Sequence, residues 1–500
     1  MFKLDADIQL TKPSYKDAEP VLVETIKQIA DKMAASGSVF DYKVSASSSG
    51  IKLSMSSASM SSCNNVLLPF EKQGAANLGK KLKVGIKEVK VLNYSVDFEV
   101  EAEPKKKISV PFIKELSFKN KKGTLAYENI PLQFIKDNFV ERTIKLIKDK
   151  IRMANYEGKD EYRETIWGGK ERPVVYRGDP AEDLEKINWI RRTPAKGQFV
   201  YGREFTALMT IFKELLVENV YSPLGFSEMV FPKFEPWEVP KKSGHAKNIY
   251  PNAYFVCTPK NASPEFWEEV MDKFAITGEV QTDMVMDKST SVGIMSYAQC
   301  PPFWTYLEGK IIDESTMPLL TFDWSGPTYR NESGGTHGLD RVEEFHRIET
   351  LFVGTKEQVV DTWQKLKTQF TKFFDSVLDI EVRVCKVTPW WMAHAGIKDK
   401  SENVDVGTYD FDAYLPYRGD RSKEWLEIQN DSSNGDKYPV AFNVRSQKYE
   451  YYWSGCAGAS LQRLIVAFLA QKGLEPKGWP ADIRKRFESR MKSIKALKYF

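Results

Sequence analysis

Cysteine is scarce in this sequence, and long apolar runs are missing. The 500 residues contain five cysteines, an odd number without any C-x-x-C spacing, which argues against a disulfide framework. The longest apolar run, residues 464–470, is far too short to span a bilayer. Residues 1–7 include two aspartates where a secretory signal has its apolar core. These absences predict a soluble cytoplasmic protein with no membrane partner.

Two common nucleotide-binding signatures are also absent. The sequence has no G-x-x-x-x-G-K-[ST] loop, which excludes a P-loop phosphate site. No G-x-G-x-x-G follows an expected strand, which disfavours a dinucleotide-binding fold.

The composition of 42% apolar, 13% aromatic and 28% charged residues is typical of a folded chain. Its length predicts about two to four domains.

Positive charge is concentrated in the first third of the chain. Residues 1–150 carry 25 Lys and Arg against 18 Asp and Glu, whereas the remainder has a net charge of −3. The lysines cluster at residues 80–83, 105–107 and 119–122. Such clusters attract phosphate backbones, but a solvated lysine-rich surface would have the same composition. Composition alone leaves both interpretations open.

Hydrophobic spacing predicts that the N-terminal third is α+β. Apolar residues at helical spacing predict helices over residues 18–34 and about 131–152. Alternation over residues 83–108 predicts strands of an antiparallel sheet. The serine-rich stretch 43–62 is expected to be a short strand and a loop.

The next segment is expected to connect two domains. Residues 153–200 contain Gly, Pro and many charges. An apolar helical stripe follows over residues 205–216. After it we expect a turn at 223–225 and a strand that ends at Phe231-Pro232.

Residues 329–349 carry the most informative pattern. They indicate two strands joined by a glycine-rich loop, with Arg330 and Arg341 at the loop ends and Phe345 just beyond. Arginine forks match phosphate oxygens, and an aromatic ring can stack on a base. Taken alone, a plain charged hairpin would show the same residues.

Three blocks of the sequence, in order, resemble the motifs of the class II aminoacyl-tRNA synthetases. Residues 224–232 resemble the end of motif 1, expected over about 215–232, which builds the dimer interface in that class. Arg330-x-Glu332 with Phe345 resembles motif 2, expected over about 320–349. Residues 454–458 with Arg463 resemble motif 3, expected over about 453–470.

Further blocks are similar to the archaeal, type 2, zinc-dependent seryl-tRNA synthetases. These blocks are residues 297–304, 344–349, 415–419 and 434–439. The resemblance implies an α+β protein with an N-terminal tRNA-binding domain over residues 1–161, made of an antiparallel sheet and helices. It implies a class II catalytic domain over residues 162–500, built on an antiparallel β-sheet with helices.

The resemblance also implies the ATP site. Arg330 would hold the α-phosphate and the substrate carboxylate, where negative charge grows in the transition state. Glu332 would accept a hydrogen bond from the adenine amino group, and Phe345 would stack on the ring. Arg341 and Arg463 would hold the outer phosphates, with Arg330 and Arg463 as the catalytic residues. The full implied ATP set is Arg330, Glu332, Arg341, Val342, Phe345, Glu427 and Arg463, with Glu427 carrying Mg²⁺.

A zinc site is implied at Cys300, Glu349 and Cys456. Spacing alone is weak evidence for it, because the three residues are far apart and a lone buried cysteine is usually a small hydrophobe. Their positions match the zinc ligands of the family. Two thiolates and one carboxylate would hold one Zn²⁺ per chain and leave a position open for the α-amino group of serine.

Serine would be held by Ala298, Arg330, Trp390, Asn430 and Ser432. A segment of about residues 388–409 is expected to order over the bound serine.

Two departures from the family pattern stand out. Gln462 precedes Arg463 where motif 3 commonly has Glu, and His394 stands where the family has Gln.

Together the blocks predict a homodimeric ligase that activates L-serine with ATP and transfers it to the 3′ end of tRNA(Ser). Its N-terminal domain would bind the tRNA. The alternative is a synthetase-like ligase that charges a carrier protein; such relatives lack a long N-terminal domain. A catalytically inactive RNA-binding paralogue is disfavoured by the intact arginines and by Glu332 and Glu427.

Overall fold

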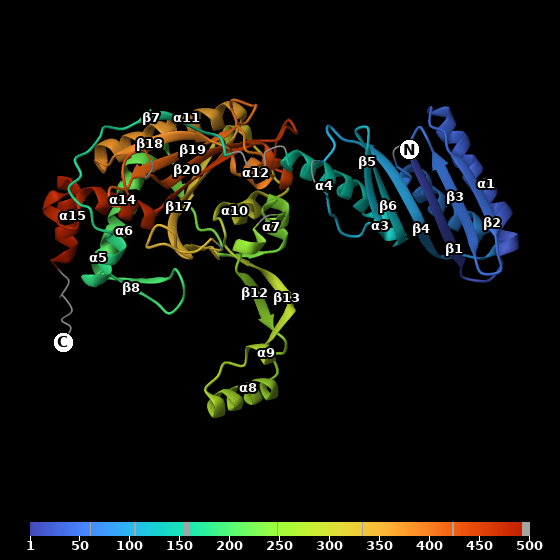
Figure 1. Ribbon diagram of the computed structural model, residues 1–500, viewed down its shortest axis with the longest axis horizontal. Coiled ribbons are helices and arrows are strands. Elements are labelled where there is room, and N and C mark those ends of the chain that lie inside the picture. The colour runs from blue at the N-terminus through green and yellow to red at the C-terminus, as the bar shows by residue number, and fades with distance from the viewer. Residues whose placement is uncertain are drawn as a thin grey trace. The chain divides into compact units, whose positions relative to one another are not determined.

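Figure 1 shows a computed structural model of the chain. The structure describes residues 1–60, 62–104, 107–154, 160–247, 249–332, 334–422 and 425–492. The chain forms two compact units, residues 1–159 with 395–397 and residues 160–394 with 398–500. Each unit has its own hydrophobic core. Among the described residues, no helix has the length and apolar content to cross a membrane.

The first unit is a six-stranded antiparallel sheet with helices, as predicted. Its strand order is β2-β3-β1-β4-β6-β5. The strands are β1 (Phe2–Leu10), β2 (Asp41–Ala46), β3 (Ile51–Ser57), β4 (Ile86–Glu99), β5 (Glu115–Lys119) and β6 (Lys122–Pro131). The helices are α1 (Tyr15–Ala35), α2 (Asn64–Leu82), α3 (Leu132–Lys136) and α4 (Phe139–Ala154). Alternate side chains of β1, from Phe2 to Leu10, are buried and form one wall of the core.

Three details of the first unit differ from the sequence-based expectation. Residues 43–62 contain parts of two strands, β2 and β3, and not one. The helix expected over 131–152 is two helices, because Asn138 adopts a left-handed conformation (φ 56°) and separates α3 from α4. Helix α2 was not predicted at all, and Pro69 inside it obscures its pattern. Lys105 and Lys106 of the second lysine cluster lie outside the described residues.

The second unit is built on a large sheet with strand order β10-β15-β17-β22-β20-β19-β18-β7, with β16 paired to β17. All of these pairs are antiparallel except β10 with β15, which are parallel. Its strands are β7 (Arg163–Gly168), β10 (Ser227–Glu228), β15 (Leu319–Asp323), β16 (Pro327–Tyr329), β17 (Glu344–Gly354), β18 (Val382–Val387), β19 (Gly407–Tyr414), β20 (Trp425–Gly435) and β22 (Trp453–Ser460).

Smaller sheets and helices complete this unit. The strands of these sheets are β8 (Ile190–Arg192), β9 (Phe199–Tyr201), β11 (Phe234–Pro236), β12 (Phe255–Pro259), β13 (Met286–Met295), β14 (Ile311–Ile312) and β21 (Arg445–Ser446). The α-helices are α5 (Pro180–Lys186), α6 (Arg203–Leu216), α7 (Glu238–Ser243), α8 (Pro264–Thr277), α9 (Thr282–Val285), α10 (Cys300–Leu307), α11 (Lys356–Lys372), α12 (Trp390–His394), α13 (Lys437–Ala441), α14 (Leu461–Lys472) and α15 (Ala481–Met491). The other helical segments are η1 (Val217–Tyr221), η2 (Ser222–Leu224), η3 (His245–Lys247), η4 (Tyr250–Asn252), η5 (Glu314–Thr316), η6 (Phe373–Val377) and η7 (Pro476–Gly478).

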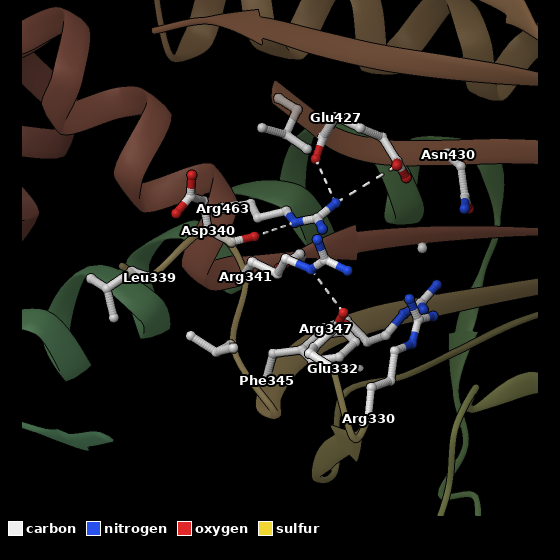
Figure 2. Close-up of a pocket in the computed structure, with 14 residues that line it drawn as sticks. Arg330, Glu332, Leu339, Asp340, Arg341, Phe345, Arg347, Glu427, Asn430 and Arg463 are labelled. Atoms are coloured by element: carbon white, nitrogen blue, oxygen red, sulfur yellow. Dashed lines mark hydrogen bonds and ion pairs between the residues drawn. The ribbon is translucent and has the colours of Figure 1, made fainter. Parts of the chain in front are cut away.

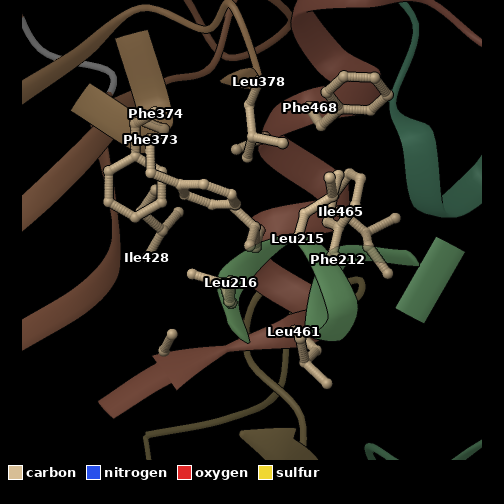
Figure 3. Close-up of a cluster of buried hydrophobic side chains, with 14 of the residues drawn as sticks. Phe212, Leu215, Leu216, Phe373, Phe374, Leu378, Ile428, Leu461, Ile465 and Phe468 are labelled. Carbon is tan, nitrogen blue, oxygen red and sulfur yellow. The ribbon is translucent and has the colours of Figure 1, made fainter. Parts of the chain in front are cut away.

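The core of the second unit lies between one face of the large sheet and helices α6, α11 and α14. Figure 3 shows Phe212 and Leu215 of α6 against Ile465 and Phe468 of α14, with Phe373 beside them. Alternate residues of β17 and β22 point into this core, and the intervening residues point to the opposite face. That opposite face carries the polar residues of the site described below.

Residues 153–200 are more than the expected connection. Strand β7 pairs with β18 at the edge of the large sheet, and α5 contributes a buried leucine to the core. The strand expected to end at Phe231-Pro232 is only Ser227–Glu228, and residues 229–233 are irregular.

Candidate active site

A pocket with a cavity volume of about 100 Å³ opens on the polar face of the large sheet (Figure 2). It lies where the loop between β16 and β17 meets strands β20 and β22 and the start of α14. Its lining residues are Arg330, Glu332, Leu339, Asp340, Arg341, Val342, Phe345, Arg347, Glu427, Ile428, Asn430, Gly458, Ser460 and Arg463. All seven residues predicted to bind ATP are among them.

Arg330 follows β16 directly and is held between two aromatic rings. Its guanidinium carbon lies 4.5 Å from the ring centre of Tyr297 and 5.3 Å from that of Phe345. Its Nε donates to the Tyr297 carbonyl at 3.3 Å. Since the hairpin of β16 and β17 supplies both Arg330 and Phe345, the two-strand motif predicted from the sequence is confirmed.

The other two predicted arginines pair with groups of the pocket itself. Arg341 Nε donates to Glu332 Oε2 at 2.8 Å. Arg463 Nε donates to the Asp340 carbonyl at 2.8 Å, and its Nη1 donates to the Glu427 carbonyl at 2.9 Å. Figure 2 shows Arg463 between Asp340 and Glu427. The C-terminal end of the glycine-rich loop is thereby fixed to α14 and β20.

Positive charge exceeds negative charge in this pocket. Burial lowers the pKa of the Arg330 guanidinium, and nearby Arg347 and Arg463 act in the same direction. A pocket in which guanidinium groups destabilise one another favours an anionic ligand. A polyphosphate together with a carboxylate has the required charge.

Arg347 is a pocket residue that the sequence reasoning missed. It is buried, and its Nη2 lies 2.6 Å from Glu349 Oε2. The strand period could have found it, because Phe345, Arg347 and Glu349 alternate along one face of β17. Asp340 was missed as well, and no spacing signal in the loop distinguishes it.

Cys300, Glu349 and Cys456 converge on the same face of the sheet. One donor atom from each lies within 4.8 Å of the others, and all three residues are buried. They come from the start of α10, from β17 and from β22, so only the folded sheet assembles them. The Asn434 side-chain nitrogen donates to the Cys456 sulfur at 3.4 Å. Two thiols and one carboxyl form a donor set that suits zinc.

The predicted serine-binding residues lie in two places. Arg330 and Asn430 line the pocket. Ala298, Trp390 and Ser432 lie outside the lining of that pocket. Ala298 and Trp390 pack on the hydrophobic cluster that contains Cys300 and Cys456. The Ser432 hydroxyl lies 2.8 Å from that of Thr408.

Gln462, which departs from the family pattern, points away from the pocket. Its side-chain nitrogen donates to the Tyr201 hydroxyl at 3.0 Å, and its oxygen accepts from the His346 backbone at 2.9 Å. The residue is fully buried. The exchange of Glu for Gln at this position therefore changes no group that lines the pocket.

The fold and the site define a class II aminoacyl-tRNA synthetase. Residues 291–472 match the family described as the tRNA synthetase class II core domain (G, H, P, S and T), and residues 1–149 match a family described as a tRNA-binding domain. The chain is 41% identical to the type-2 serine–tRNA ligase of Methanococcoides burtonii, over 89% of each chain. It is 38% identical to that of Methanothrix thermoacetophila, over 87% of this chain and 86% of the relative. The chain belongs to the type-2 serine–tRNA ligase family, and it is a ligase.

The same fold occurs in a solved structure. The seryl-tRNA synthetase of Methanopyrus kandleri, crystallised with a tRNASec of A. aeolicus, superposes with a TM-score of 0.81 at 23% identity, over 98% of this chain and 97% of that chain. This likeness covers both units of the chain and confirms the predicted fold class.

Proposed function

We propose that this chain forms seryl-adenylate from serine and ATP in the pocket of Figure 2 and then transfers serine to tRNA(Ser). One observation carries the proposal. Arg330, Arg341 and Arg463 direct three guanidinium groups into a single pocket, next to the buried Cys-Glu-Cys cluster. The first group of residues suits a triphosphate, and the second suits a metal that binds the α-amino group of the amino acid.

Each residue has a role that its position supports. Arg330, which lines the pocket, binds the α-phosphate and the serine carboxylate and stabilises the charge that grows there. Glu332 and Phe345 bind the adenine, with Val342 as an apolar contact, and Arg341 and Arg463 bind the outer phosphates. Glu427 would hold Mg²⁺, a hard cation suited to carboxylate and phosphate oxygens. No protein nucleophile is needed, because the serine carboxylate attacks and positioning accounts for most of the acceleration.

Binding of ATP in this way requires one exchange of partners. Arg341 now pairs with Glu332, whose carboxylate is expected to face the adenine amino group. The Arg341 side chain is 46% exposed, so opening this ion pair costs only about 0–1 kcal/mol. Arg341 is then available to the outer phosphates.

Cys300, Glu349 and Cys456 would hold one Zn²⁺. A zinc ion with three protein ligands offers an open position that the α-amino group of serine can take. Asn434 keeps the Cys456 sulfur oriented through its hydrogen bond. Because every α-amino acid has that amino group, the hydroxyl must be read by other residues. Asn430 and Ser432 are our candidates, with Ala298 and Trp390 limiting the space.

The larger assembly is part of the same proposal. The basic N-terminal domain, residues 1–161, would bind tRNA(Ser), and the catalytic domain, residues 162–500, would dimerise through motif 1 in the cytoplasm. The match of residues 1–149 to a tRNA-binding family supports a tRNA acceptor over the alternative of a carrier-protein acceptor. Residues 388–409 would order over bound serine.

ATP–pyrophosphate exchange across all amino acids tests the proposal. Serine should support exchange strongly, alanine should not, and Arg330→Lys should lose most of the activity, because a lysine cannot form the bidentate contact. Arg191→Lys, at an exposed arginine outside the pocket, is the matched control. Exchange that depends on an amino acid other than serine would refute the proposed substrate.

A further inference from the structure

The connection between β4 and β5 in the first unit exposes an aromatic ring to solvent. Phe112 is 76% exposed. Two nearby residues are anchored in the core: Val110 is buried, and Ile113 packs against the core. Lys150 of α4 donates to the Ser109 carbonyl at 2.5 Å. The turn is therefore held on both sides while the phenyl ring projects outward.

The backbone of Phe112 is in a conformation that disfavours phenylalanine. Its φ is +65°, and it follows Pro111 in a turn. Glycine usually takes the second central position of a Pro-containing turn when φ is positive. A residue with a Cβ in the left-handed region costs about 1–2 kcal/mol. Among the described non-glycine residues with positive φ, the only other aromatic one is Tyr449.

Neither local conformation nor packing accounts for this ring. Glycine would relieve the backbone, and a ring that is mostly exposed contributes little to the core. Strained residues that persist on a surface often mark a binding site.

The surroundings of Phe112 indicate what it could bind. Its ring contacts Phe134 edge-on at 6.4 Å, and Phe134 contacts Phe139 at 4.8 Å. Phe139 is 36% exposed, and the guanidinium of Arg142 lies 5.5 Å from its ring centre. Arg142 is exposed on α4. An exposed ring supported by other rings, with a cation beside them, offers stacking to a planar base and charge to a phosphate.

We propose that Phe112 stacks on an unpaired base of the tRNA, with Phe139 and Arg142 completing the contact. This inference rests on the proposed tRNA partner, which the tRNA-binding family match and the basic charge of residues 1–150 support. Unpaired bases in loops and bulges are the parts of an RNA that aromatic side chains can reach. The partner is an RNA and not a protein surface, because the ring lies in the part of the chain with excess positive charge.

Phe112→Gly in the full-length chain is the decisive variant, because it removes the ring and relieves the backbone at once. Stacking on one base contributes about 1–3 kcal/mol. We therefore expect the Kd for tRNA(Ser) to rise about 5- to 150-fold, while Tm and ATP–pyrophosphate exchange with serine do not fall. The slope of log Kd against log salt should stay the same, because no phosphate contact is removed. Phe112→Trp should retain affinity.

Asn129→Gly is the matched control, since Asn129 is an exposed residue of the same unit with positive φ (54°). It should leave the Kd unchanged. An unchanged Kd in Phe112→Gly would overturn the inference, as would a weaker salt slope, which would mean that the turn acts through phosphate contacts. A loss of dimer without a change in Kd would assign the ring to a protein contact instead. If the wild-type chain bound no tRNA, the proposed partner itself would be wrong.

Discussion

Arg418 forms an ion pair with Asp340, and the two residues join the β19–β20 connection to the loop between β16 and β17. The Arg418 guanidinium also contacts Nδ1 of His337, at 2.6 Å. Asp340 is buried, and its backbone carbonyl accepts the hydrogen bond from Arg463. Arg418 therefore acts on the pocket without lining it: it fixes Asp340, which in turn fixes a guanidinium that we expect to bind phosphate.

Arg418→Gln should raise the KM for ATP more than it lowers kcat. One charged hydrogen bond contributes about 1.5–3 kcal/mol, which corresponds to a change of about 10- to 150-fold. Arg418→Lys should restore part of the loss, and the exposed Arg191→Gln should have no effect. Pyrophosphate exchange at varied ATP concentration measures both constants. A fall in Tm that accompanies the rise in KM would indicate a folding defect and not a positioning role.

Two glycines of β22 should respond differently to alanine. A Cβ at Gly458 would overlap the guanidinium of Arg347, whereas a Cβ at Gly455 would overlap the buried ring of Phe352. Gly458→Ala should therefore displace Arg347 from Glu349 and reduce kcat/KM for serine with little change in Tm. Gly455→Ala should lower Tm, since a packed ring in the core cannot move freely. Thermal unfolding and exchange kinetics of the two variants test this prediction. A loss of stability without a loss of kcat/KM in both variants would contradict it.

Purified protein is expected to hold about one zinc per chain, and removal of the metal should lower Tm. The three ligands meet only in the folded sheet, so metal binding stabilises the native state by roughly 2.7 kcal/mol at a hundredfold excess over Kd. Elemental analysis and unfolding with and without chelator test this. Cys300→Ser should lose both zinc and the chelator effect, whereas Cys257→Ser, outside the cluster, should keep them. A fully active enzyme that contains no zinc would refute the metal site.

The stability of the second unit should depend on Glu235. Burial raises the pKa of its carboxyl to about 8. The folded state thus keeps a proton that the unfolded state releases above its own pKa, so stability falls as pH rises from about 4.5 to about 8. Glu235→Gln should raise Tm at pH 8 more than at pH 5. Each kcal/mol gained in the free energy of unfolding should raise Tm by roughly 2–4 °C. The exposed Glu238→Gln should show no such difference between the two pH values.

Trp390 should determine how well serine is distinguished from threonine. Its ring is stacked on the imidazole of His245, with 4.6 Å between the ring centres. The Lys437 ammonium lies 3.5 Å from the centre of the Trp390 ring. A ring held in this way can exclude one extra methyl group, which pocket contacts alone discriminate by only about 1–3 kcal/mol. Trp390→Ala should raise the KM for serine and lower the serine-to-threonine ratio of kcat/KM. An unchanged ratio would exclude Trp390 from the specificity of the site.

Much of this site could be predicted from the sequence because its residues lie in short, ordered blocks. Arg330 and Phe345 are on one hairpin, and Arg463 starts the helix that follows β22. Contacts that join distant segments leave no local signal, and the grouping of Cys300, Glu349 and Cys456 was expected only from the family resemblance. Trp390 meets His245 across 145 residues, a contact set by folding and by no local period. Strand β7 is mostly exposed, so it lacks the alternation that would have revealed it as an edge strand of the sheet.

The register of three neighbouring strands has a consequence for changes in chain length. Glu349 and Asn430 both lie opposite Gly458, while Ser432 lies opposite Cys456. Since side chains alternate along a strand, deleting a single residue within β22 would turn Cys456 into the core and bring Ala457 to the polar face. Substitutions in these strands change one group at a time, but an insertion or deletion exchanges every group beyond it. In this part of the sheet we therefore expect changes in length to preserve activity in the connections between strands and not within β22.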